Sequence, residues 1–148
     1  YNCCCQCRTI KAGRERSNND MKNFDYTVTT KKSFDEAVKS VEEETKRAGF
    51  RVLYTHDVAT TLAEKNFQIE PFKIIEICNA KSAYTVLKAD IKIGLCLPCK
   101  INVYIKDKQT FISGMRPIIL SQFFPKANLG DLPKEIDKFI KEIIDKSI

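Results

Sequence analysis

The sequence lacks every motif by which the common hydrolases are recognised. It has no Gly-x-Ser-x-Gly elbow, no glycine-rich phosphate loop and no His-Glu-x-x-His pair. His56 is the only histidine, so any Cys/His catalytic pair or mixed metal site has to use it. The longest apolar runs fall well short of the eighteen or so residues that a membrane-spanning helix needs. The first residues also lack the apolar segment of a secretory signal. We therefore expect a cytoplasmic protein with no membrane partner.

The composition is that of an ordinary folded domain. Hydrophobic residues make up 43% and charged residues 30% of the 148 residues, which excludes wholesale disorder. The net charge is +6, and outside the first twenty residues its lysines mostly alternate with glutamates. A nucleic-acid-binding protein usually gathers basic residues on one element with aromatic residues between them. We therefore expect a solvated Lys/Glu surface and no nucleic-acid partner. The abundance of Lys, Glu and Ile hints at a thermophilic source.

The first 22 residues differ from the rest of the chain. They show no hydrophobic period and are rich in Cys, Asn, Arg and Lys, which is typical of a disordered tail. Met21 is a candidate for the true initiator, and residues 23–148 are predicted to form a single domain. The tail contains four of the seven cysteines, without the two-residue gaps that suit structural zinc: Cys3, Cys4, Cys5 and Cys7.

Five segments have the alternation and β-branched content of strands, namely 24–30, 50–58, 72–78, 97–105 and 110–115. Residues 107–109 lie between the last two and predict a hairpin turn. Because the strands are joined by one hairpin and several crossovers, we expect an α+β fold. Its sheet should be mixed or mainly antiparallel, with the helices packed on one face.

Two helices are indicated between these strands, a third follows the last strand, and residues 57–66 are predicted to form a short helix or turn. Ser33 and Glu36 form a capping box that opens the first. Asn79 can cap a second, and a third runs from Pro133 to the C-terminus. The predicted inward positions are Ala80, Ala83, Tyr84 and Leu87 in the second helix, and Ile136, Phe139, Ile140, Ile143 and Ile144 in the third.

Several stretches together resemble the family called domain of unknown function 302, over residues 24–120. They are Ala48-Gly49-Phe50, Lys65 after Thr61-Leu62, the run from Ile75 to Ala80, and the run from Ile93 to Tyr104 with its Leu97-Pro98-Cys99 strand entry. The resemblance implies a compact α+β fold and a homodimer, and no agreed activity. Cys96 departs from the family pattern, in which an aliphatic residue is usual, and Ala80 stands where proline usually follows the asparagine.

Cys96 and Cys99 have the Cys-x-x-Cys spacing that permits a redox disulfide or a shared metal ion. In thioredoxin-like proteins this motif opens a helix, whose dipole lowers the pKa of the first thiol. Here the motif leads into a strand, so that activation is missing. The alternative is that both residues are inert, half-buried side chains.

Cys78 stands next to a predicted helix N-terminus, which stabilises a thiolate, and Lys81 is a nearby cation. The alternative is a buried cysteine at a strand end. Of the Cys-x-x-Cys pair, Cys99 is expected to matter more, because it matches the family's strand entry. Its strand parity predicts an apolar setting that raises the thiol pKa. A role for Cys99 therefore needs a compensating group, and Lys81, Lys65 or the amides after Cys78 are the candidates.

His56 completes a possible metal set with Cys78, Cys96 and Cys99. A polar histidine at a strand end is more often a surface residue. Lys65, which matches a family position, can equally be a helix-surface charge.

These residues leave two functions open. The first is a thiol-dependent one, in redox, sulfur or metal handling, through Cys78 and Cys99 with Cys96 as a resolving thiol. The second is a non-catalytic homodimeric module that binds a small apolar ligand or a protein partner. For the second, the apolar stretch from Ile118 to Phe124 could line a cavity or a dimer surface, although core packing explains it as well. The residues identify no cofactor and do not decide whether the protein is an enzyme.

Overall fold

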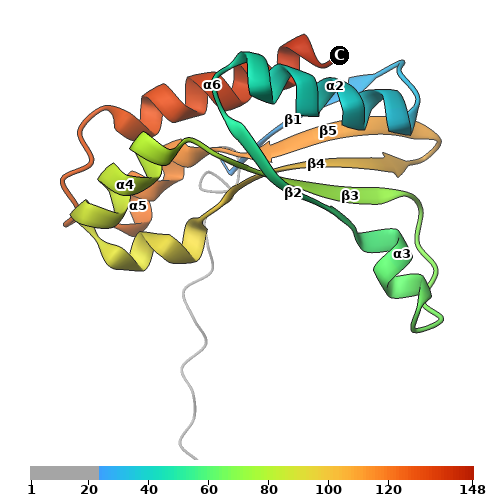
Figure 1. The fold of residues 1–148 in the computed structure, drawn as a ribbon, viewed down its shortest axis with the longest axis horizontal. Helices are drawn as coiled ribbons and strands as arrows, with labels where there is room; N and C mark the ends of the chain where they lie inside the picture. Colours follow the sequence, from blue (N-terminus) through green and yellow to red (C-terminus); the bar gives the residue numbers. More distant parts are fainter. Residues whose placement is uncertain (1–23) are drawn as a thin grey trace, which may run out of the picture.

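The computed structural model describes residues 24–148, so the predicted tail and its four cysteines lie outside the described residues. Figure 1 shows the chain as one layer of helices packed against a sheet, with a group of short helices at one end. In chain order the elements are β1 (Asp25–Thr30), α2 (Phe34–Arg47), β2 (Arg51–Asp57), α3 (Val58–Ala63), β3 (Phe72–Cys78), α4 (Ala80–Ala89), the 3₁₀ helix η1 (Ile91–Cys96), β4 (Cys99–Lys106), β5 (Gln109–Met115), the 3₁₀ helix η2 (Pro117–Ile119), α5 (Leu120–Phe123) and α6 (Leu132–Lys146).

The sheet has five strands in the order β1-β5-β4-β3-β2, and every neighbouring pair is antiparallel. Helices α2 and α6 lie across one face (Figure 1). The predicted α+β class, antiparallel sheet and one-sided helix layer are therefore confirmed. The group formed by α4, η1 and α5 is an addition to that picture, because it sits beyond one end of the strands.

Local chemistry explains where the main elements begin and end. Ser33 and Glu36 form the predicted capping box: the Ser33 side chain accepts from the Glu36 amide, and the Glu36 carboxylate accepts from the Ser33 amide. After α2 the chain turns at Gly49, whose φ of +79° suits a residue without a Cβ. Between β4 and β5, Asp107 and Lys108 have φ of 51° and 61°, the left-handed pair of a two-residue hairpin turn.

The main core lies between the sheet and helices α2 and α6. Alternate residues of β3 and β4 enter it from the sheet, and Ile140, Ile143 and Ile144 of α6 meet them. Gly114 of β5 allows α6 to approach closely, because an added Cβ would lie 2.9 Å from Ile144 Cδ1 and 3.0 Å from Ile140 Cγ2. Phe139 is an exception to the predicted inward set: it is 42% exposed and contacts Phe50 ring to ring, 5.8 Å between centroids.

A second, smaller core joins the group of short helices, and it contains Val86, Ile93, Leu120 and Leu129. The stretch therefore packs inward through Ile118, Ile119, Leu120 and Phe124, whereas Ser121, Gln122 and Phe123 are exposed. The predicted inward face of α4 is wrong at Tyr84, which is 67% exposed, and at Ala80, which is also exposed, while Val86 is buried instead. The reason for the difference is η1, which was not predicted: it packs against α4, and Val86 joins Ile93 of η1 in the smaller core, where the predicted Leu87 also packs.

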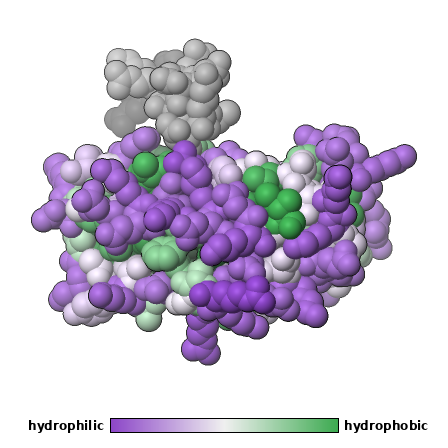
Figure 2. Space-filling model, turned by 90° about the horizontal axis from the view of Figure 1, so that it is seen from above, coloured by the Kyte–Doolittle hydropathy of each residue, from purple (hydrophilic) through white to green (hydrophobic). Residues whose placement is uncertain are grey.

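Two surface observations complete the description. The face over the helix layer is mostly hydrophilic (Figure 2), as the Lys/Glu composition predicts. Within residues 24–148, no helix has both the length and the apolar character needed to cross a bilayer.

Candidate functional site

A small cavity of about 30 Å³ lies where the end of the sheet meets the group of short helices. By the measure of a water-sized probe this is room for a water molecule or a few non-hydrogen atoms. Its walls come from Phe50 and the ends of β3, β4 and β5, from α4 and η1, and from η2, α5 and α6. The lining residues are Phe50, Ile77, Cys78, Asn79, Ser82, Ala83, Val86, Cys96, Leu97, Cys99, Met115, Pro117, Leu120 and Ile136.

Sulfur is concentrated at this cavity. All three cysteines of the described residues line it, together with Met115, the one methionine among them. The three thiols are free rather than paired in a disulfide. Their neighbours in the wall are almost all aliphatic or aromatic, so the cavity is an apolar space bordered by soft, polarisable atoms.

Cys99 begins β4, and its backbone pairs with Ile77 of β3. The side chain packs against the main core, as its strand parity predicts. Burial raises the pKa of the Cys99 thiol from 9.0 to about 11, and the neighbouring Cys78 and Cys96 thiols add to the rise, while Lys100 opposes it. Burial therefore outweighs the nearby cation, and the Cys99 thiol is protonated at neutral pH.

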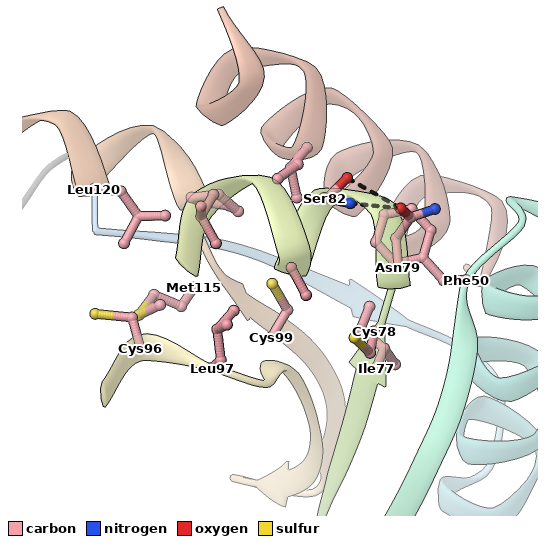
Figure 3. A pocket seen from close by; sticks show the side chains of 14 residues that line it. Phe50, Ile77, Cys78, Asn79, Ser82, Cys96, Leu97, Cys99, Met115 and Leu120 are labelled. Atoms are coloured by element: carbon pink, nitrogen blue, oxygen red, sulfur yellow. Dashed lines mark hydrogen bonds between the residues drawn. The ribbon is translucent and has the colours of Figure 1, made fainter. Parts of the chain in front are cut away.

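Cys78 ends β3 directly before Asn79, the predicted N-cap of α4. The Asn79 side-chain oxygen accepts hydrogen bonds from the Ser82 amide, at 3.0 Å, and from the Ser82 hydroxyl, at 3.1 Å (Figure 3). The polar groups that border the cavity are thus engaged with each other in the helix cap. An incoming ligand would meet mainly apolar and sulfur atoms.

Cys96 ends η1, and Leu97 and Pro98 separate it from Cys99, the first residue of β4. Leu97 is extended, with φ −101° and ψ 154°, as expected before a proline. In Figure 3 the Cys96 sulfur points away from the sulfurs of Cys99 and Cys78. The Cys-x-x-Cys spacing therefore places both residues on the cavity wall without turning their thiols toward each other.

The predicted cations are not beside Cys99. Lys81 is an exposed residue of α4, and Lys65 is exposed after the end of α3, at the opposite end of the sheet. The basic side chain that does favour the Cys99 thiolate is Lys100, its neighbour in β4. Lys100 was not among the predicted compensating groups, although it adjoins Cys99 in the sequence.

His56 is not brought to the thiols either. In the sheet it pairs with Ile74, four positions along β3 from Cys78, and its Nε2 lies 3.0 Å from the Thr61 hydroxyl. Its ring stacks on Tyr54. Within residues 24–148, no group of three or more His, Cys, Asp or Glu side chains is placed to hold a metal ion.

Three residues of the cavity wall were not predicted from the sequence as site residues. Met115 ends β5, Phe50 begins the segment after Gly49, and Pro117 opens η2. Their positions in the chain could have indicated this, because each of the three residues lies where a strand or turn meets the same end of the sheet. Arg116, between two of these residues, fixes η2 to α6 by donating from Nε to Asp137 Oδ1 at 3.0 Å and from its terminal nitrogen to Oδ2 at 2.9 Å.

Comparison with known proteins gives the chain a family. The model of the domain of unknown function DUF302 matches residues 26–147. The chain belongs to the DUF302 family. A solved structure of similar fold is the crystal structure of an uncharacterized conserved DUF302 protein from Bacillus stearothermophilus, with a TM-score of 0.79 and 31% sequence identity. The match covers 84% of this chain and 98% of that one. No curated protein matches the chain. The predicted resemblance is therefore confirmed, and it extends through α6.

Proposed function

We propose that this DUF302 domain is a binding module that holds a small apolar ligand, or the apolar end of a larger one, in the sulfur-lined cavity. The observation that carries the proposal is the lining itself, which is apolar and sulfur-rich, with its few polar groups already bonded in the α4 cap. Such a space has little to offer a charged molecule, because a buried charge without a partner is costly. A polarisable apolar ligand of a few atoms gains dispersion contacts there and gives up few favourable interactions with water.

The state of Cys99 favours binding over catalysis. A nucleophilic cysteine acts as the thiolate, and the pKa of about 11 leaves only a very small thiolate fraction at neutral pH. The thiol then serves as a compact, polarisable wall atom rather than as an attacking group.

Xenon tests this proposal without knowledge of the natural ligand, because it enters small apolar cavities that stay dry. We expect dissolved xenon to shift the methyl NMR signals of Val86, Leu97 and Leu120, with little effect on methyl groups of α3. Ala83→Leu should fill the cavity and abolish these shifts. Thr85→Leu, on the exposed side of the same helix, is the matched control and should retain them. Equal shifts in the wild type and Ala83→Leu, or none in the wild type, would refute the proposal.

A thiol-dependent function is the second candidate, and the gathering of Cys78, Cys96 and Cys99 on one cavity favours it. In this case Cys78 is the best-placed nucleophile, since it adjoins the N-cap of α4. Alkylation of single-cysteine variants in native and denatured protein separates the two candidates. A Cys78 that reacts faster in the native protein supports the thiol function, whereas three thiols that react more slowly than in the denatured protein support the binding module.

We also propose that the protein is a homodimer, and that the sheet face opposite α2 and α6 is the contact surface. That face carries a row of three stacked rings, Phe72, Tyr104 and Phe111, with centroids 5.5 and 5.3 Å apart.

A further inference from the structure

The positive charge of the described domain is concentrated in one segment. Residues 24–148 contain twenty basic and seventeen acidic side chains. Residues 80–100 alone carry four lysines against the single Asp90, while everything else in the described part balances at sixteen of each sign. The lysines of this segment therefore depart from the alternation with glutamates that is seen in the rest of the described chain. The segment comprises α4, η1 and the entry to β4.

The same segment carries the three most exposed large apolar side chains of the described residues. Leu95 is 88% exposed, Ile91 75% and Tyr84 67%. Large apolar side chains exposed singly are normal, but three of them on one corner are not explained by the packing of this chain.

Helical geometry places these side chains outward together with the lysines. In α4, Lys81, Tyr84 and Lys88 follow one another at helical spacing on the side away from the buried Val86. In η1 the three-residue period sends Ile93 and Cys96 inward, and Lys92 and Leu95 outward. The two helices pack together at one corner of the molecule (Figure 1). Here the "α4–η1 corner" means Lys81, Tyr84, Lys88, Ile91, Lys92 and Leu95.

We propose that the α4–η1 corner docks on the surface of an anionic lipid membrane. Leu95 and Ile91 would enter the boundary between headgroups and acyl chains, Tyr84 would lie at the headgroup level, and the lysines would face anionic headgroups. No ion pair within the described residues engages Lys81, Lys88 or Lys92. Their charge is thus available to an external partner.

The form of the corner favours a lipid surface over an acidic protein. A stable protein interface needs a broad complementary patch of roughly 800 Å² per partner. A few protruding apolar side chains with lysines beside them suit a fluid interface, which adapts to their shape. This peripheral contact differs from a membrane-spanning segment, on whose absence the expectation of no membrane partner rested. Hydropathy along the sequence does not detect it, because the exposed Ile91 and Leu95 alternate with Lys92 and with Ile93, which is buried.

Flotation of the full chain with lipid vesicles, under reducing conditions, tests the proposal. We expect the protein to float with vesicles of phosphatidylcholine and phosphatidylglycerol, to remain behind with pure phosphatidylcholine, and to lose much of its binding at high salt. Ile91→Glu/Leu95→Glu and, separately, Lys88→Glu/Lys92→Glu should each weaken partitioning by at least about tenfold.

Two control variants match the corner variants in the change of charge and in the exposure of the side chains that are replaced. Lys39→Glu/Lys46→Glu makes the same charge change on exposed residues of α2, and Phe67→Glu replaces an apolar side chain that is 65% exposed elsewhere. Both should bind like the wild type. The proposal fails if wild-type protein does not float, or if these controls lose as much binding as the corner variants. It also fails if Ile91→Glu/Leu95→Glu binds normally, because the attraction would then be charge alone. Binding to soluble polyglutamate or to RNA but not to vesicles would assign the corner to an acidic macromolecule instead.

Discussion

Cys99 illustrates how burial and charge compete at a single side chain. It lies between the main core and the cavity, and the desolvation of a thiolate there exceeds the help that Lys100 provides. The Cys78 and Cys96 thiols nearby act in the same direction as burial. A cysteine in this setting is stable as a neutral side chain and resists both alkylation and oxidation.

This setting predicts a loss of stability at alkaline pH. Because the pKa of Cys99 is about 11 in the folded protein against an ordinary 9.0, the folded state retains the proton that the unfolded state loses. The protonated Cys99 thiol thus contributes about 2–3 kcal/mol to the free energy of unfolding. This contribution is complete below about pH 9 and is lost as the pH rises to about 11. Urea unfolding of wild type and Cys99→Ala at pH 8 and pH 10.5 measures it. We expect the stability gap between the two proteins to narrow at the higher pH, and a constant gap would contradict the assignment.

The sequence was informative about side chains whose position follows from alternation or capping. The parity of Cys99 with Ile101 and Val103 and the cap at Asn79 were both predictable. The direction of the Cys96 sulfur was not, because it depends on η1. The place of Met115 in the cavity wall was not predictable either. The sequence of β5 does not indicate that its last residue borders a cavity formed mainly by other elements.

At the scale of helices and strands, the η1 helix shows why part of the fold escaped prediction. Ile91, Ile93 and Leu95 alternate with period two, which resembles a strand, yet the segment winds as a 3₁₀ helix. Asp90 favours the helix over a strand, because its side chain accepts a hydrogen bond from the Lys92 amide and caps the first turn. Strands and hairpins with strong alternation were predictable, whereas a short helix defined by its cap and by packing on α4 was not.

The contact between α6 and β5 depends on the absence of a side chain at Gly114. We expect Gly114→Ala to destabilise the protein by about 1–3 kcal/mol, because the new methyl group would displace Ile140 and Ile144 from a packed core. Thermal or urea unfolding of the variant gives the measurement. Gly94→Ala is the matched control: its methyl group would meet only Leu87 Cδ2, at 3.4 Å, so a change within about 0.5 kcal/mol is expected. Equal losses in the two variants would show that the effect comes from the backbone rather than from the α6 contact.

On the scale of the whole molecule, the helix layer covers one face of the sheet and leaves the stacked rings on the other. The proposed homodimer predicts a dimer mass in sedimentation equilibrium at micromolar concentration. Tyr104→Lys, in the middle of the ring row, should give a monomer, since a lysine there would meet its own copy across the twofold axis. Phe123→Glu, at an exposed phenylalanine of α5, should remain dimeric. A monomeric wild type, or a dimer in both variants, would rule out this surface.

The position of β1 at the edge of the sheet has a consequence for how the chain folds during synthesis. β1 is the first described strand to leave the ribosome, yet it pairs only with β5, and the hydroxyls of Thr27 and Ser113 that meet across this pair are 86 residues apart. Strands β2, β3, β4 and β5 instead pair in the order in which they are made. Closing so long a loop costs more entropy than forming the hairpin of β4 and β5, so β1 docks late. Until β5 is complete, β1 remains an unpaired strand rich in β-branched residues, and an unpaired strand edge favours aggregation.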